Sequence, residues 1–296
     1  MPEGPAEEVK RVQAHNKQSR TLRKQALHAF TQEGQPGAYL ADMADSFESM
    51  LHVEPADPSA GHHFVLPAYF TLLEALVEAG MKFELILRTF GADAAEVLQE
   101  HNAYCAGKHP LYPGAQPLDG SVAGRPDLRV SLPRCTATAT LGAYDVPHIC
   151  APVAQPDAGD ALVMQRFDGP HGLQNWLNTL HANAASGSQG LVCAVMDDFP
   201  SWHLGGEVGA KGKLFPLNPG SAAPLEVFFD DNILQHWDDC KIVHPIDADT
   251  GKPIPADDEV LRSVHLVRVL TSEVVQDPHY FVRMLQAAHT AQLKWA

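Results

Sequence analysis

The stretch KFELILRTFGAD, residues 82–93, contains a short apolar run that ends at Thr89 and meets a turn signal at Gly91. An apolar run of this length, bounded by a glycine, predicts a buried strand. Helical patterns flank it on both sides, in LPAYFTLLEALVEAG (66–80) and AAEVLQEHNAYCAG (94–107). A helix, a strand and a helix joined by tight connections are typical of α/β folds, so we expect a mostly parallel sheet.

The composition indicates a folded protein and disfavours polyanions as its main partners. The chain has 296 residues, of which 45% are hydrophobic and 19% charged, which is enough for a sizeable core. Its formal charge of −15 disfavours nucleic acid and anionic membranes as partners, because both repel an acidic surface. Oligomeric state stays open.

Several absences favour the cytoplasm. The start MPEGPAEEVKR has no apolar core of a signal peptide, and no apolar run approaches the ~20 residues that span a bilayer. The five cysteines are odd in number and lack CxxC spacing, so neither a disulfide framework nor a cysteine zinc site is expected. We therefore expect a cytoplasmic protein in a reducing compartment.

The sequence divides into three regions that differ in composition and hydrophobic pattern. Residues 1–61 are expected to form a tail followed by helices. Residues 62–107 and 190–296 carry the α/β pattern of the expected core. Residues 108–189 are rich in proline and glycine, with short possible strands and one helical pattern, and we interpret them as an inserted cap or loop region.

The second part of the expected core contains further strand patterns. We expect strands in GLVCAVMDDF (190–199), LEVFFD (225–230), CKIVHPID (240–247) and VHLVRVLTS (264–272). A final helix follows Asp277 and Pro278, a favourable helix entry.

Polar residues mark the ends of these strands. Thr89 closes the first strand, a lysine at 213 or 211 precedes a later one, and Asp230 and Asp231 close LEVFF. Ligands of open α/β sheets bind at the carboxyl ends of strands. Two adjacent carboxylates repel each other unless a cation or a proton lies between them, so this pair is a candidate metal site.

This order of motifs resembles the haloacid dehalogenase-like (HAD) phosphohydrolase superfamily, and RTFGAD and FFDDNI resemble an uncharacterised branch of it. The resemblance implies a Rossmann-like core with an inserted cap. It also implies that Thr89 hydrogen-bonds a phosphoryl group, that Lys213 offsets negative charge, and that Asp230 and Asp231 hold Mg²⁺. A phosphorylated small molecule is the partner that these roles imply.

The nucleophile motif of that superfamily, an apolar strand ending in DxD, has no match before Thr89. The nearest candidate is Asp42, in a DxxD pattern. The family places the nucleophile strand between the strands that carry the threonine and the Asp-Asp pair, so its loss leaves a vacant position in the sheet. The strand ending in Asp197 and Asp198 fills that position only in a rearranged topology.

Each candidate residue also has an ordinary structural interpretation. Asp230 and Asp231 suit a turn, Thr89 a buried strand end, Lys213 and Lys211 a solvated loop, and Asp197 and Asp198 a helix cap. Arg88 either binds an anion or pairs with a carboxylate, and pairing is favoured. Cys105 lacks a placed base that would make it a nucleophile.

Three functional hypotheses follow. The first is a HAD-like protein that is inactive because the nucleophile is absent and that retains a magnesium and phosphate site. The second is an N-terminally truncated, Mg²⁺-dependent phosphohydrolase. The third is an unrelated α/β binding domain, which would be favoured if no parallel sheet joined residues 83–89 to residues 225–230.

Overall fold

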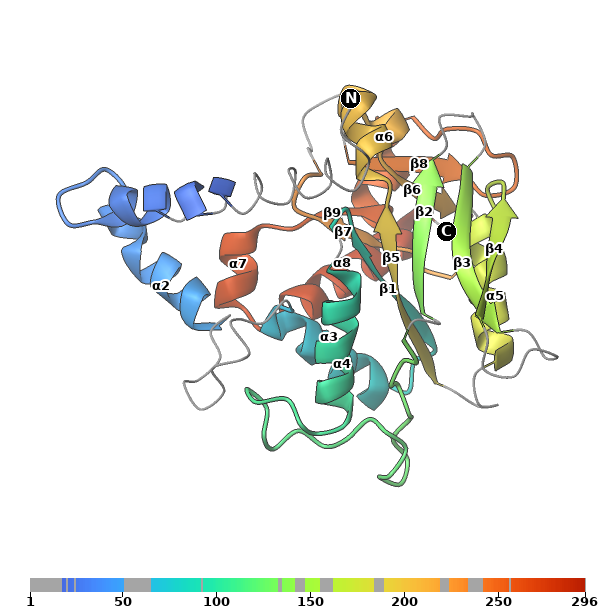
Figure 1. Cartoon of the computed structure of the whole chain (residues 1–296), viewed down its shortest axis with the longest axis horizontal. Coiled ribbons are helices and arrows are strands. Elements are labelled where there is room, and N and C mark those ends of the chain that lie inside the picture. The colour runs from blue at the N-terminus through green and yellow to red at the C-terminus, as the bar shows by residue number, and fades with distance from the viewer. Residues whose placement is uncertain are drawn as a thin grey trace, which may run out of the picture. The chain divides into compact units, whose positions relative to one another are not determined.

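The computed structural model describes most of the chain, in two compact units formed by Met1–His52 and Val53–Ala296. The described residues are 18–19, 21–23, 25–50, 65–91, 93–132, 135–141, 147–154, 162–183, 189–218, 224–233, 242–255 and 257–295. Figure 1 shows the elements of each unit.

The first unit is helical where it is described. Residues 25–31 are helical, a 3₁₀ turn η1 covers Ala38–Leu40, and helix α2 covers Ala41–Met50. The helices expected in this region are therefore present. The residues before Asp42 form the 3₁₀ turn rather than the apolar strand that a nucleophile motif requires.

The second unit is mixed α/β, which confirms the expected class. Its main sheet has the order β1-β5-β2-β3-β4, with bounds as follows. The strands are β1 Phe83–Thr89, β5 Gly190–Asp197, β2 Thr136–Leu141, β3 Pro147–Ala154 and β4 Leu162–Asp168. Strands β1, β5 and β2 are parallel, with Thr89 opposite Met196, and β3 and β4 are antiparallel. Strands β2 to β4 come from the region expected to be an insert, so that region supplies part of the main sheet.

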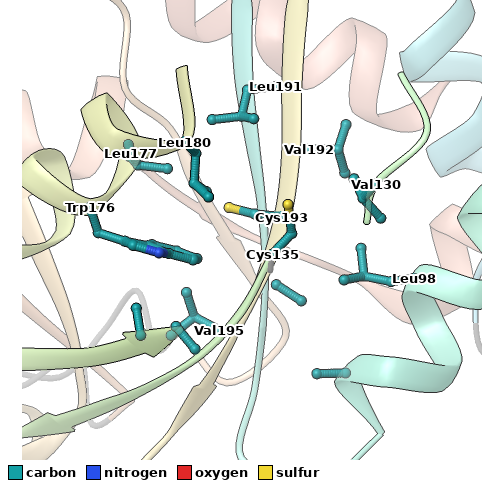
Figure 2. Packing of buried hydrophobic residues seen from close by; sticks show 14 of the residues in the cluster. Leu98, Val130, Cys135, Trp176, Leu177, Leu180, Leu191, Val192, Cys193 and Val195 are labelled. Carbon is teal, nitrogen blue, oxygen red and sulfur yellow. The ribbon is translucent and has the colours of Figure 1, made fainter. Parts of the chain in front are cut away.

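Strand β5 is buried on both faces, which explains its unbroken apolar sequence. Figure 2 shows Trp176, Leu177 and Leu180 of helix α5 (Gly172–Asn183) on one side of the strand, toward Cys193. Leu98 of helix α4 (Ala94–Cys105) and Val130 lie on the other side, near Val192. The two helices therefore cover opposite faces of the sheet, as in an α/β sandwich.

A second apolar cluster lies around helix α3 (Pro67–Glu78). Phe70 and Leu73 of α3 are almost fully buried, and the Phe70 ring stacks on Tyr104 with centroids 4.2 Å apart. Helix α8 (Tyr280–Trp295) also packs against α3, through Tyr280 and Ala68. The apolar stripe of LPAYFTLLEALVEAG is thus covered on both sides.

Two small parallel sheets complete the second unit. Strand β6 (Lys213–Leu217) pairs with β8 (Val243–Asp247), and β7 (Phe228–Asp230) pairs with β9 (Leu266–Arg268). The strand expected over 225–230 is therefore shorter than its pattern suggests. The expected strand over 264–272 is also wrong in extent. It is reduced to β9 between a π-helical turn η3 (Leu261–His265) and helix α7 (Thr271–Gln276).

Strand β1 lies at the edge of the main sheet. Among the described residues its strand partner is β5, whose other neighbour is β2. Strand β7 belongs to a different sheet, so β5 does not lie between β1 and β7. The rearranged topology, in which the Asp197 strand fills the vacant position, is therefore wrong. No sheet of the described residues joins β1 to β7, and this arrangement favours the unrelated-domain hypothesis in that respect.

Within the described part of the chain, none of the helices combines the length and the apolar character that crossing a bilayer requires.

Candidate functional site

The carboxyl ends of β1 and β7 and the start of β6 meet around one buried ion pair. The ammonium of Lys213, the first residue of β6, donates to Asp230 Oδ2 over 2.8 Å. Both residues are 8% exposed. Lys213 is thus a buried strand residue and not a solvated loop lysine, and it lies 17 residues from its partner along the chain.

Backbone packing positions Lys213. A Cβ at Gly212 would lie 2.4 Å from the carbonyl oxygen of Ile242, so only glycine lets the chain pass so close to the start of β8. The amide of Lys213 then donates to the same carbonyl at 2.7 Å. The Phe90 ring lies 5.2 Å from the ammonium, a cation–π contact that excludes water from one side.

Asp230 has a donor on each carboxylate oxygen. Its Oδ1 accepts from the Asn232 amide at 2.9 Å and from Asn232 Nδ2 at 3.3 Å, which closes a turn after β7. Asp230 therefore takes part both in the turn that the sequence predicted here and in the ion pair. Lys213 supplies the positive charge that the adjacent carboxylates require.

Asp231 is more exposed than Asp230, and the two carboxylates share Asn232 Nδ2 as a donor. Burial and the neighbouring charge of Asp230 raise the pKa of Asp231, while Lys213 lowers it. Asn232 Nδ2 donates to Asp231 Oδ1 over 2.8 Å. Asp231 is therefore the member of the pair whose carboxylate faces solvent and which most favours a proton or a cation.

Thr89 engages its own turn. Its hydroxyl donates to Asp93 Oδ1 at 2.8 Å and accepts from the Gly91 amide at 2.8 Å. A Cβ at Gly91 would lie 2.6 Å from that Asp93 oxygen, so a larger residue there would displace the Asp93 side chain. Phe90, the next residue, contacts Lys213, whereas the Thr89 hydroxyl serves this turn. The structure therefore brings the Thr89 segment to the ion pair but occupies its hydroxyl locally.

Arg88 forms a second buried ion pair, as its neighbourhood of carboxylates predicts. Its guanidinium donates to both oxygens of Asp197 and, through Nη1, to the Leu214 carbonyl at 2.5 Å. The side chains of Arg88 and Asp197 are 8% and 4% exposed. Arg88 thus links the ends of β1 and β5 to β6, and the Asp197 carboxylate is committed to this structural role.

Arg268 is a site residue that the sequence analysis missed. It lies opposite Asp230 in the register of β7 and β9, which places both side chains on one face of that ladder. Its Nε is buried and has no hydrogen-bond partner among the described residues. An arginine within the apolar run VHLVRVL was the available signal, because a buried cation needs an acceptor.

The remaining candidates lie outside the ion pair. Lys211 ends the turn η2 (Gly209–Lys211), and its stem lies against Gly205. Asp198 caps helix α6 (Phe199–Leu204) by accepting from the Ser201 amide at 3.0 Å, as its cap interpretation predicts. Asp42 is exposed in the first turn of α2, in the other unit.

Two carboxylates are a sparse site for a metal ion. No cluster of three or more histidine, cysteine or acidic side chains is found among the described residues. Mg²⁺ uses one or two carboxylates together with water and substrate phosphate, so Asp230 and Asp231 fit it only with a ligand that supplies further oxygens. Arg268, opposite Asp230 in the register of β7 and β9, places a positive charge on the same face of that ladder.

Other polar groups of the second unit are buried for structural reasons. His101 contacts the Tyr69 hydroxyl through Nδ1 at 2.9 Å, and His109 contacts Glu100 at 3.1 Å. Burial raises the pKa of the Cys105 thiol to about 12, which makes it a poor nucleophile. The histidines at 62–63 lie outside the described residues.

Comparison with known proteins leaves the resemblance untested. The sequence matches no family model, no curated protein and no solved structure.

Proposed function

We propose that this protein binds a phosphorylated small molecule beside the Lys213–Asp230 pair, together with Mg²⁺, and does not hydrolyse it. The proposal follows the HAD-like interpretation of the sequence. Its main support is the buried contact between a lysine and an aspartate that the motif order had paired. Phosphate binding requires cations placed around a spread negative charge, and protein side chains can supply them without catalysis.

Three groups would contact the ligand. Arg268 offers a buried guanidinium nitrogen that lacks an acceptor among the described residues. Asp231 offers a solvent-facing carboxylate for the cation. Lys213 lies between the two strand ends and neutralises Asp230, and a phosphate oxygen would share its ammonium.

Hydrolysis through an aspartyl phosphate requires an attacking carboxylate. Asp197 and Asp230 are held in ion pairs, and Asp42 lies on a helix of the other unit. These positions support a binding role over catalysis for the described carboxylates.

A calorimetric titration tests the binding proposal. Phosphate and a phosphomonoester are titrated in the presence and absence of Mg²⁺, and heat is expected when both components are present. Arg268→Met should weaken this binding, whereas Arg283→Met on helix α8 serves as a matched control, because Arg283 pairs locally with Asp277. No heat from any combination would refute the proposal.

The alternative is a truncated, Mg²⁺-dependent phosphohydrolase. One observation favours it: among the described residues β1 is an edge strand, although residues 85–87 at its centre are aliphatic on both faces. A strand paired along that edge would end beside Thr89 and could carry a nucleophile. Phosphatase activity toward an aryl phosphate with Mg²⁺ tests it, for this chain and for a form extended upstream of Met1. Absence of turnover in both forms would exclude this alternative.

A further inference from the structure

Aromatic side chains gather beside the Lys213–Asp230 pair. They come from the turn after β1 and from helix α6 after β5, at the carboxyl ends of strands where α/β sheets bind ligands. We call this group the aromatic platform. Its members are Phe90, Phe199, Trp202 and His203.

The rings of the platform contact one another. Phe90 stacks on Trp202 with centroids 5.0 Å apart and an interplanar angle of 20°. Phe199 stacks on His203 with centroids 5.4 Å apart and an angle of 10°. His203 Nδ1 contacts Glu207 Oε1 at 2.8 Å, which holds the imidazole in place. The platform is therefore arranged before any ligand arrives.

Part of the platform faces solvent. Phe199 is 41% exposed, and the neighbouring Leu204 is 85% exposed. Contiguous exposed apolar surfaces mark binding sites, and α/β sheets bind ligands at the carboxyl ends of their parallel strands. Helix α6, which carries both residues, follows the buried strand β5 directly (Figure 1).

The platform and the ion pair are within reach of one small molecule. The Phe90 ring lies 5.2 Å from the Lys213 ammonium and its centroid lies 5.8 Å from that of Phe199, so Phe199 is within about 11 Å of Lys213. We propose that the ligand is a phosphomonoester with an aromatic group. Its ring stacks on Phe199 while its phosphate contacts Lys213 and Arg268. This inference rests on the proposed function and adds the ligand's class to it.

Charge favours a neutral aromatic group over a cationic one. His203 carries the only ring of the platform that can become positive, and Glu207 already pairs with it. Offset stacking between neutral rings depends on shape and polarisability, so it works for aryl groups and nucleobases alike. The shared chemistry is an aromatic ring linked to a phosphate.

Three compounds separate the contributions of phosphate and ring. Phenyl phosphate, cyclohexyl phosphate and inorganic phosphate are titrated calorimetrically against the full chain in Mg²⁺. Cyclohexyl phosphate matches the size and apolar character of the phenyl ester but lacks a π face. We expect phenyl phosphate to bind roughly tenfold tighter than cyclohexyl phosphate, the gain that one stacked ring provides.

Phe199→Leu should abolish this preference and leave the affinity for inorganic phosphate unchanged. The leucine keeps an apolar side chain at a partly exposed position, so the fold should persist, and circular dichroism checks it. Tyr39→Leu, at an exposed aromatic residue of the first unit, is the matched control and should keep the preference. Equal affinities for the two esters, or a preference that survives in Phe199→Leu, would overturn the inference and leave the proposed function standing. Absence of binding by all three compounds would overturn both.

Discussion

Replacing Lys213 with methionine should destabilise the protein far more than replacing both members of its ion pair. Methionine keeps most of the lysine stem, so the variant loses a charge but little volume. Asp230, which is 8% exposed, is then a buried carboxylate without its cation. Breaking one partner of a buried pair costs about 3–5 kcal/mol.

The structure places Lys213→Met at the lower end of this range. Asp230 keeps the two donors of Asn232 on Oδ1, so its negative charge stays partly compensated. We expect a loss of about 3 kcal/mol in the free energy of unfolding. In the double variant Lys213→Met with Asp230→Asn the loss should fall to about 1 kcal/mol, because no buried charge remains.

Urea unfolding followed by circular dichroism measures both values, and the double-mutant cycle isolates their coupling. Lys294→Met, at an exposed position of α8, is the control and should change stability by less than ~0.5 kcal/mol. A Lys213→Met variant as stable as this control would contradict the buried contact. So would a double variant no more stable than the single one.

Three further predictions concern the neighbouring elements. Burial and the Asp230 charge raise the pKa of Asp231 in the folded protein above its unfolded value of about 3.9. The protonated form of Asp231 therefore stabilises the fold at low pH, and this stabilisation is lost as the pH rises through the folded-state pKa. The free energy of unfolding of Asp231→Asn in urea should therefore rise relative to that of wild type between pH 4 and pH 7. A difference between the two proteins that does not change with pH would refute this. Asp198→Ala should lose about 1 kcal/mol in urea unfolding, because the Ser201 amide loses its cap, while Asp198→Asn should lose less. Burial raises the pKa of the Cys105 thiol to about 12 and that of Cys193 well above its usual range, so iodoacetamide at pH 8 should label neither until urea unfolds the protein, as mass spectrometry would show.

Local patterns in the sequence predicted those helices and strands in which the spacing of apolar residues matches the face that is buried. Helix α3 and strand β1 occur where the apolar spacing places them, because the same residues form the cores against which they pack. Strand β5 is similar, since a strand buried on both faces is a continuous apolar run. These elements establish the α/β class without tertiary information.

Long-range pairing limited the rest of the prediction. Strand β6 contains Pro216, which argues against a strand, yet it pairs with β8 alone among the described residues, and an edge position tolerates proline. The region 264–272 is rich in β-branched and apolar residues, as strands are, but its first two residues belong to a π-helical turn in which Leu261 and Val264 are buried. The proline-rich region, in which the sequence indicated only short possible strands, supplies three strands of the main sheet. Strand β2 joins the sheet through β5, and β3 and β4 extend it from β2, a long-range pairing that local patterns do not reveal.

The candidate site was predictable in its pairing but not in its charge balance. The order of motifs led to Lys213 and Asp230, which are in contact, while Arg268 enters only through the register of β7 and β9. Thr89 illustrates the opposite error, because its hydroxyl serves a turn with Asp93 that a strand-end interpretation does not anticipate.

If the proposed function holds, the charges at the site predict that metal and phosphate bind together. Three cations and four carboxylates lie on the segments that meet there, a surplus of one negative charge. They are Arg88, Lys213, Arg268, Asp93, Asp197, Asp230 and Asp231. A phosphate dianion alone would add to this surplus, and the net charge of −15 on the whole chain would also oppose it. Mg²⁺ alone would find few oxygen ligands. Each component corrects what disfavours the other, so metal and phosphate should bind with positive coupling, and each should raise the affinity of the other by the same factor.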